Sequence, residues 1–572
     1  MKLAIFYRTL LRIARPLLIV NCVTSQYAAA SSNGSSNGAA GMHQWFIRPD
    51  GGDRKQCTGE VDAPYHGKGT MQPCAFRHPY YLFTNDEYNN KHWVVEGGDT
   101  ILIHGGPYRM GYKGPAARDY WGSCPGDPFG CTMPPIPSGT PGHPTRLLGE
   151  DHGACKQKTQ LYGGYGLGTV INLAGAKNVE IECLELTDHT QCTRVGAGYP
   201  ASEGCNSSFP LDDYSSVGIG TNTETANITL RDLYIHGFTS RGIIGAIGGE
   251  IDVERVRIAF NGAAGWDFDD GKGTKSSPSA WVKASYLTVE WNGCNEEYPI
   301  RHEVPAHNCF DQDHGGYGDG IGTPDTTLNF TCNHCIIRYN TQDGFDLLHA
   351  SGSTIAISNS MAYGNMGQQW KIGAMREVRF QNNLTVNNCK RLSAPVKDAP
   401  ADYNRYLSLF CRAGGDGITF VVTDGGKYIF QSNSFAGYGA TSYDIQCSGT
   451  CSTASIIFQN NLNIGIKSPY DGRPPGIFYL GENVPRGTLL ENHNIYYNMR
   501  TCPVGHAERC VDPKIAYLPQ WKGEESLDGI DFHLTSESPA RGAGVSVGID
   551  TDHDGMLRSG SSVDIGAFQY RH

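Results

Sequence analysis

Short apolar runs separated by polar turns recur through the central part of the chain. Segments such as KNVEIECLELTDH, ANITLRDLYIHGF and TIAISNSMAYGNM each read as two short strands joined by a polar turn. The turn positions recur at 25 residues from His236 to Asn261 and from Asn340 to Asn365, and at 23 residues from Asn365 to Asn388. A period in the twenties with strands and no helix predicts a solenoid of stacked β coils. We therefore predict an all-β, right-handed parallel β-helix with long loop insertions and terminal caps.

The segments outside the repeat predict how the chain is divided. Four basic residues precede an apolar stretch over Pro16–Val23 and the small residues Ala28–Ala30. This order predicts a secretory signal peptide, so we expect a secreted (extracellular or periplasmic) protein without a membrane span. The expected parts are a signal peptide over 1–30, a Ser/Asn/Gly linker over 31–42, the β-helix over 43–527 with an inserted lobe near 109–170, and a C-terminal cap over 528–572.

Charge and cysteine content narrow the choice of partners. Removing the four basic residues of the signal peptide takes the formal net charge from −11 to −15, which argues against nucleic acid as a partner. It also leaves 18 of the 19 cysteines, an even number, in an oxidising compartment, where we expect disulfides that staple loops. The near-neighbour pairs in the sequence are Cys57/Cys74, Cys124/Cys131, Cys192/Cys205, Cys294/Cys309, Cys389/Cys411, Cys447/Cys451 and Cys502/Cys510. The C-x-x-C pair at 332 and 335 has no second pair, so a disulfide is expected there rather than a zinc site.

Candidate chemistry gathers between residues 319 and 371. This stretch contains Asp319, Gln342, Asp343, Asp346 and Lys371. Carboxylate and amide oxygens are the ligands that a hard cation prefers, and a nearby amine suits metal-assisted proton abstraction. The alternative for any one of these acids is a side chain that caps a turn, since Asp-Gly pairs are common turn formers.

The repeat predicts which of these residues are neighbours in space. Residues at the same offset from the turn asparagine stack on successive coils. Six positions after Asn340 is Asp346, and six positions after Asn365 is Lys371. Adjacent coils are ~4.8 Å apart, so these two side chains are expected to lie side by side, with Asp319 on the coil before. Six positions after Asn261 is Asp267, which with Asp269 and Asp270 is a weaker candidate for a supporting ligand or a solvated loop.

The motifs GDGIG, CIIRYNTQDGFDLL, SNSMAYGN and WKIG resemble the calcium-dependent pectate lyases of polysaccharide lyase family nine over residues 311–391. The resemblance implies that Asp319, Asp343 and Asp346 bind Ca²⁺ and that Lys371 is the catalytic base. Gln342 stands where the family usually has aspartate, and an amide oxygen can still bind calcium. The lysine motif also departs from the family pattern, because it reads QWKIG where the family has G-F-K-[LI]-G.

The chemistry that the resemblance implies is β-elimination on a uronic-acid polymer. Bound calcium would neutralise the uronate carboxylate, and the lysine would abstract the C5 proton. A lysine must be neutral to act as a base, so we expect an alkaline pH optimum. Eight basic and three acidic residues lie between positions 371 and 412, and Arg376 among them is expected to bind the anionic polysaccharide. The enzyme is expected to act as a monomer.

Two other functions stay open at this point. A glycoside hydrolase on the same fold would use paired carboxylates, but it would not explain Lys371 in the same column. A non-catalytic carbohydrate-binding β-helix is the other alternative, because fold does not determine function. The C-terminal region contains a D-x-D-x-D-G motif formed by Asp550, Asp552, Asp554 and Gly555, which could start a calcium loop. A polar turn is the alternative, because position twelve of such a loop should be glutamate and is Ser561 here.

Overall fold

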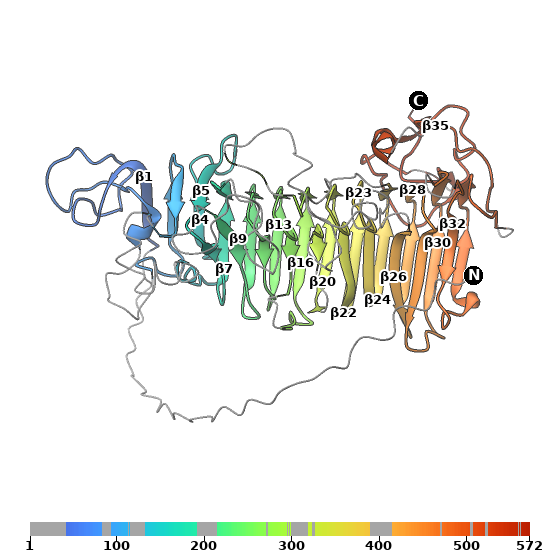
Figure 1. Cartoon of the computed structure of the whole chain (residues 1–572), viewed down its shortest axis with the longest axis horizontal. Helices are drawn as coiled ribbons and strands as arrows, with labels where there is room; N and C mark the ends of the chain where they lie inside the picture. Colours follow the sequence, from blue (N-terminus) through green and yellow to red (C-terminus); the bar gives the residue numbers. More distant parts are fainter. Residues whose placement is uncertain are drawn as a thin grey trace, which may run out of the picture. The chain divides into compact units, whose positions relative to one another are not determined.

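Parallel strands follow one another coil upon coil in the computed structural model, from β1 (Gln44–Gly52) to β34 (Ile495–Tyr497) (Figure 1). The structure describes residues 42–82, 93–112, 114, 132–190, 214–269, 273–294, 296, 298, 318–322, 326–388, 415–468, 472–503, 507–520, 524–558, 560 and 562–571. The predicted signal peptide and nearly all of the predicted linker lie outside these residues. No helix among the described residues is long and apolar enough to cross a membrane.

Three parallel ladders make up the coils, and each coil passes through ladder 1, ladder 3 and ladder 2 in that order. Ladder 1 consists of β1, β2 (Thr100–Ile103), β4 (Thr145–Gly149), β7 (Lys177–Glu182), β10 (Ala226–Arg231), β13 (Glu250–Glu254), β16 (Trp281–Ser285), β20 (Asn329–Asn333), β22 (Phe345–Ser358), β24 (Trp370–Gln381), β27 (Lys427–Gln431), β30 (Ser455–Gln459) and β33 (Leu489–Asn492).

Ladder 2 consists of β6 (Leu167–Asn172), β9 (Ser215–Gly220), β12 (Arg241–Ile244), β15 (Trp266–Asp267), β18 (Ile321–Gly322), the first parts of β22 and β24, β26 (Asp416–Thr423), β29 (Thr441–Ser448) and β32 (Gly476–Leu480). Ladder 3 consists of β3 (Tyr108–Met110), β5 (Thr159–Gly163), β8 (Leu184–Asp188), β11 (Tyr234–His236), β14 (Arg257–Ala259), β17 (Thr288–Glu290), β21 (Ile336–Arg338), β23 (Met361–Tyr363), β25 (Leu384–Asn387), β28 (Ser434–Gly437), β31 (Leu462–Gly465) and β34.

This arrangement confirms the predicted parallel β-helix. Where no long loop intervenes, paired residues of ladder 1 are 23 to 28 positions apart; Ile228 pairs with Ile251, and Tyr428 pairs with Ile456. The short strand β19 (Thr326–Thr327) adds a pairing to β22. Within the region 109–170, where an inserted lobe was predicted, β4, β5 and β6 are strands of the ladders.

The turn from ladder 1 to ladder 3 is the same in ten successive coils. A single residue with φ between 49° and 58° follows each ladder 1 strand from β7 to β33; these residues are Cys183, Asp232, Arg255, Tyr286, His334, Asn359, Asn382, Ser432, Asn460 and His493. This left-handed backbone conformation is energetically unfavourable for most residues other than glycine, and least so for Asn and Asp. Its repetition shows that the bend there is required by the coil, whichever side chain occupies it.

The turn from ladder 3 to ladder 2 is different, because its length varies. Asp188 ends β8 and Ser215 begins β9, Glu290 ends β17 and Ile321 begins β18, and Asn387 ends β25 while Asp416 begins β26. These are the long insertions of the sequence. Elsewhere the same turn is short: His236 ends β11 and Arg241 begins β12. Ladder 2 is therefore bordered by the connections that change length from coil to coil.

Buried asparagines stack beside this variable turn. The side-chain amide of Asn261 donates to Asn292 (2.9 Å), that of Asn292 to Asn340 (2.9 Å) and that of Asn340 to Asn365 (2.8 Å). The row ends at Gln369, whose Oε1 accepts the amide of Asn365 at 2.8 Å. Each amide thereby satisfies its neighbour inside the coil, where an unpaired polar group would be destabilising.

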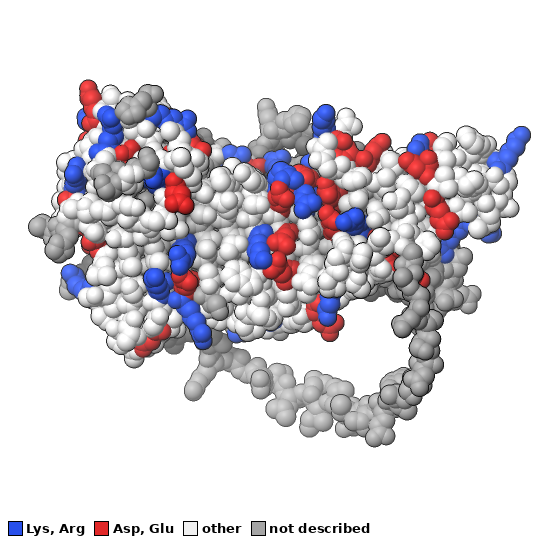
Figure 2. All heavy atoms as spheres, turned by 180° about the vertical axis from the view of Figure 1, so that it is seen from behind, with Lys and Arg blue, Asp and Glu red and all other residues white. Residues whose placement is uncertain are grey.

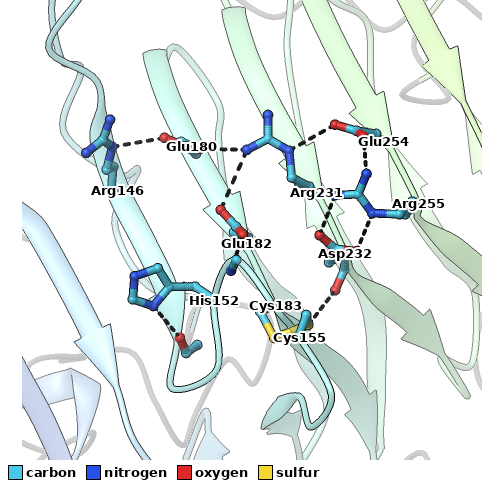
Figure 3. Close-up of polar contacts among 12 residues, drawn as sticks. Arg146, His152, Cys155, Glu180, Glu182, Cys183, Arg231, Asp232, Glu254 and Arg255 are labelled. Atoms are coloured by element: carbon cyan, nitrogen blue, oxygen red, sulfur yellow. Dashed lines mark hydrogen bonds and ion pairs between the residues drawn. A yellow bond between two sulfur atoms is a disulfide. The ribbon is translucent and has the colours of Figure 1, made fainter.

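Alternating charges cover part of ladder 1 (Figure 3). Arg146 donates to Glu180 at 2.9 Å, while Arg231 donates to Glu180 at 3.2 Å and to Glu254 at 3.1 Å. Figure 2 likewise shows side chains of both signs close together on the face in view. Partly exposed ion pairs of this kind each contribute ~1 kcal/mol or less, so they balance charge across strands more than they stabilise the fold.

Five disulfides lie within the described residues: Cys57–Cys74, Cys155–Cys183, Cys332–Cys335, Cys447–Cys451 and Cys502–Cys510. Three of them are near-neighbour pairs, and the C-x-x-C pair also forms a disulfide as expected. Cys155–Cys183 was not among the pairs noted in the sequence. Cys294 is disulfide-bonded, and the remaining predicted pairs lie outside the described residues.

The residues predicted as a C-terminal cap lie along the outer side of ladder 3. Two antiparallel strand pairs form here: β35 (Ile515–Tyr517), which precedes the predicted cap, with β36 (Asp531–Leu534), and β37 (Gly544–Val545) with β38 (Ser562–Val563). Leu527, Phe532, Leu534, Ile565 and Phe568 join Leu384, Val386, Leu462, Ile464 and Ile495 of ladder 3 in a second hydrophobic cluster. Short 3₁₀ helices also occur among the described residues: η1 (Pro79–Leu82), η5 (Arg486–Thr488) and η6 (Glu524–Gly529).

A buried histidine on ladder 3 holds the beginning of one long insertion. His236 is fully buried, with one ring nitrogen 2.6 Å from a carboxylate oxygen of Glu296 and the other 2.9 Å from Glu185. Burial opposes the charged form of His236, but the two carboxylates outweigh it and raise its pKa to about 9. The imidazolium therefore links the insertion after β17 to the coil.

This histidine predicts a loss of stability in alkali. Because the pKa of His236 is higher in the folded chain than its ordinary value near 6.5, the stabilisation is complete below about pH 6.5 and is lost as the pH rises through about 9. The full effect is about 3 kcal/mol. Thermal unfolding midpoints of the wild type should fall more between pH 6.5 and 9.5 than those of His236→Gln. Equal pH dependence of the wild type and His236→Gln would contradict this assignment. A pH dependence reduced to the same extent in the control His334→Gln would contradict it as well.

Candidate metal and base site

The candidate residues meet on the outer side of ladder 2. Trp266, Ile321, Phe345 and Trp370 pair in register across four coils and are buried in the core. The following residue of each strand points to the opposite side. These outward residues are Asp267, Gly322, Asp346 and Lys371, which pair in the same register. The structure thus places Asp346 and Lys371 on adjacent coils, where the spacing from the turn asparagines predicted them.

Asp319 reaches this column because Gly322 leaves room for it. A Cβ on Gly322 would lie 2.9 Å from Oδ2 of Asp319, so the carboxylate occupies the space of a side chain at position 322. Oδ1 of Asp319 accepts the backbone N–H of Asp343 at 2.8 Å. Asp319 therefore lies on the coil before Asp343 and Asp346, as expected, and its carboxylate is fixed by the next coil.

Three carboxylates and one ammonium form the site. One oxygen from each of Asp319, Asp343 and Asp346 lies within 4.8 Å of the others. Nζ of Lys371 is 2.6 Å from Oδ2 of Asp343 and 3.0 Å from Oδ2 of Asp346. Lys371 is 7% exposed and Asp343 is 1% exposed, so these charges are almost completely removed from water. A small opening to solvent remains at Lys371 and at Asp346, which is half-buried.

Counted over these four described residues, the cluster carries more negative than positive charge. With all four groups ionised, three carboxylates face one ammonium, and the net charge is −2. Burial, followed by the charges of Asp343 and Asp346, raises the pKa of Asp319 well above its ordinary value. Burial also raises the pKa of Asp346, and Lys371 opposes that shift. A dication is the ligand that would remove this imbalance.

The donor set fits a hard cation such as Ca²⁺. All candidate donors are oxygens, which calcium prefers over nitrogen and sulfur. Oε1 of Gln342 is buried without a hydrogen-bond partner among the described residues, and Gln342 precedes Asp343 directly. A buried amide oxygen without a partner, in the residue that precedes Asp343, is a candidate for a further oxygen ligand. Within the described part of the chain, this is the group of acids that could hold a metal ion.

Neighbouring backbone positions the carboxylates. The other oxygen of Asp343, Oδ1, accepts the N–H of Gln368 at 2.6 Å, and Oδ1 of Asp346 accepts the N–H of Leu348 at 3.0 Å. A Cβ on Gly367 would lie 2.0 Å from Oδ1 of Asp343, so this close approach requires glycine. Gln369, which departs from the family motif, ends the asparagine row two residues before Lys371. Sequence reasoning missed these supports, although the Gly-Gln-Gln run before the lysine marks them.

Other candidates from the sequence lie elsewhere. Asp267 is in the column but forms an ion pair with Arg241 (2.6 Å), and its Oδ1 accepts the N–H of Asp269 at 3.0 Å. Asp270 lies outside the described residues. Arg376 is exposed on β24, five residues beyond Lys371, and its role in substrate binding stays a prediction. Among the other basic residues of that region, Arg379 pairs with Glu377.

The D-x-D-x-D-G segment is organised as a turn. Asp552 is buried and its carboxylate accepts backbone N–H groups of Asp554, Met556 and Gln569 at 2.8 to 2.9 Å. Asp554 is 3.0 Å from a ring nitrogen of His533. These bonds use the carboxylates that a calcium loop would need, so the polar-turn alternative describes the observed geometry.

Comparison with known proteins gives structural similarity only. No protein-family profile matches the chain, and no curated protein sequence matches it. Among solved structures, the crystal structure of pectate lyase Pel9A is 13% identical, with a TM-score of 0.41, over 93% of this chain and 98% of that chain. A rhamnogalacturonan lyase is 11% identical, with a TM-score of 0.37, over 86% of this chain and 97% of that chain. Both of these structural neighbours are polysaccharide lyases.

Proposed function

We propose that this protein is a secreted polysaccharide lyase that cleaves a uronic-acid polymer by cation-assisted β-elimination, with Lys371 as the base. The observation that carries the proposal is the contact of the Lys371 ammonium with two members of a buried three-carboxylate cluster. Abstraction of a proton next to a carboxylate requires a base close to a cation that binds the carboxylate, and an amine in contact with the cation's oxygen ligands meets this requirement. Several disulfides among the described residues are compatible with export.

Asp319, Asp343, Asp346 and Gln342 would hold the cation, for which Ca²⁺ fits best. When bound, the cation neutralises the uronate carboxylate and so makes the C5 proton more acidic. The protein's own part begins with the two carboxylates that contact Lys371. They stabilise its ammonium in the metal-free chain, and their engagement as ligands would remove that stabilisation.

Neutral Lys371 then abstracts the C5 proton of the bound uronate. The electrons of the C5–H bond form the C4–C5 double bond, and the C4–O bond breaks. The departing oxygen keeps that bond's electrons and takes a proton from solvent or from a nearby acid. Because the neutral amine is favoured at high pH, product formation should increase from neutral to mildly alkaline pH.

The direct experiment is to follow the ultraviolet absorbance of the unsaturated product on polygalacturonate, rhamnogalacturonan and alginate, with calcium and with a chelator. The expected result is absorbance that requires calcium on at least one polymer. New reducing ends without absorbance would instead support a hydrolase using Asp343 and Asp346 as paired carboxylates. Calcium binding with no cleavage of any polymer would support a carbohydrate-binding protein.

A further inference from the structure

The outward column of ladder 2 continues beyond Lys371. Lys371 pairs with Thr419, Thr419 with Asp444, and Asp444 with Tyr479. The residues that precede the first three, Trp370, Ile418 and Tyr443, are buried, so the column faces outward on every coil. Coils are ~4.8 Å apart, which is close to the length of one pyranose unit in a polymer. A polysaccharide lying across these strands would present one sugar to each coil.

The far end of the column carries an exposed aromatic ring. Tyr479 is 53% exposed on β32, three coils beyond Lys371. Its neighbour Phe478 instead stacks on Tyr443 in the interior, with ring centroids 5.5 Å apart. A tyrosine offers a flat apolar face and a polar hydroxyl, which suits the face and rim of a sugar ring.

Between Lys371 and Tyr479 the column contains one acid, Asp444, and a second acid, Asp416, begins the strand that carries Thr419. Thr441 donates to Asp416 at 2.5 Å, and the side chain of Gln446 donates to Asp444. Neither acid forms an ion pair with a lysine or arginine of the described chain. Burial, and then the charge of Asp416, raises the pKa of Asp444 to about 6, so Asp444 is ionised at neutral pH.

Thr419 supplies an unused polar group at the same place. It is 5% exposed, and its Oγ1 has no hydrogen-bond partner among the described residues. It lies between Lys371 and Asp444 in the column. A buried hydroxyl without a partner indicates a position where a ligand completes the hydrogen bonding.

We propose that Thr419, Asp444 and Tyr479 extend the polymer site one to three coils beyond Lys371 and form a subsite in which the sugar unit facing Asp444 is uncharged. This inference rests on the proposed function of the Lys371 site. The carboxylate of Asp444 accepts sugar hydroxyls and repels a uronate carboxylate, and Tyr479 stacks on a ring. The uncharged unit is either a neutral sugar or a uronate whose carboxylate is esterified.

The test compares the affinity of three polymers at pH 8, where Asp444 is ionised. These are polygalacturonate, the same polymer partly methyl-esterified, and rhamnogalacturonan, measured by retardation in polymer-containing native gels in a Lys371→Ala background. We expect polygalacturonate to bind about fivefold more weakly than a polymer with uncharged units, because of like-charge repulsion. Asp444→Asn should remove most of this difference, and Tyr479→Ala should weaken binding of all three about fivefold.

Matched controls carry the same substitutions on ladder 1 or on the turn that follows it. Asp252→Asn removes an acid that also lies beside another acid, Glu250, and Tyr286→Ala removes a tyrosine that is 55% exposed. Equal affinity for all polymers with no effect of Asp444→Asn would overturn the subsite, as would equal effects of Tyr479→Ala and Tyr286→Ala. A preference for the esterified polymer alone would identify the ester, and one for rhamnogalacturonan alone would identify the neutral sugar.

The outcome for the subsite is separate from that for the lyase. Unsaturated product measured with the wild type reports on Lys371 and its cation. If the wild type forms the product and the Lys371→Ala protein binds every polymer with equal affinity, the proposed function is supported and the subsite is overturned. If the wild type forms no product but the expected affinity ratios are found, the subsite is supported and the proposed lyase function is overturned.

Discussion

Lys371→Ala should lower the rate of unsaturated-product formation by about a thousandfold or more, since a positioned general base contributes about 10²–10⁴-fold and Lys371 is the amine that contacts Asp343 and Asp346. Calcium affinity should be kept or increased, because the ammonium that competes for Asp343 and Asp346 is gone. The measurement pairs the absorbance assay with calorimetric titration of calcium.

Lys283→Ala is the control for that experiment, because Lys283 forms an ion pair with Glu250 on ladder 1. Its activity should equal that of the wild type. Residual activity of Lys371→Ala above about a tenth of the wild-type value would remove Lys371 from the role of base. Loss of calcium binding together with activity would show that the lysine organises the cation site instead.

Asp319→Asn should have opposite effects on the metal-free and calcium-bound protein. Because the pKa of Asp319 is raised in the folded chain, its ionisation costs stability as the pH rises through that folded-state value. A neutral amide removes this cost, and its oxygen can still accept the N–H of Asp343. The metal-free variant should therefore be at least as stable as the wild type at pH 8, while calcium affinity falls at least about tenfold.

Thermal unfolding with a chelator and with excess calcium measures both effects. Calcium at 100 times its dissociation constant should stabilise the wild type by about 2.7 kcal/mol and the variant much less. Asp267→Asn, in the same column but paired with Arg241, should keep the calcium response. A metal-free Asp319→Asn that is less stable than the wild type, with an unchanged calcium response, would mean that Asp319 has a structural role only.

The sequence predicts the coil and one pair of site residues well, because both depend on a regular spacing. The turn asparagines mark equal positions on successive coils, and counting from Asn340 and Asn365 correctly aligns Asp346 with Lys371. Parallel strands in register carry such a column without further information.

Features that depend on contacts between distant segments could not be read in this way. Asp319 enters the column through the space left by Gly322, which no spacing rule reveals. Gln369 ends the asparagine row by turning its side chain inward, and a glutamine beside a lysine gives no sign of that. The C-terminal segment was predicted as a cap, but its packing against ladder 3 depends on hydrophobic side chains that are far apart in sequence.

The unequal turns of the coil have a consequence for how such a protein can diversify. The connection from ladder 1 to ladder 3 is one or two residues long and contains one left-handed residue in each of ten coils, so a length change there would shift the register of the strands that follow. The connection from ladder 3 to ladder 2 already varies from a few residues to more than twenty without disturbing the pairing. New segments can therefore be acquired beside the Lys371 column while the scaffold is inherited unchanged, which separates the evolution of specificity from that of folding.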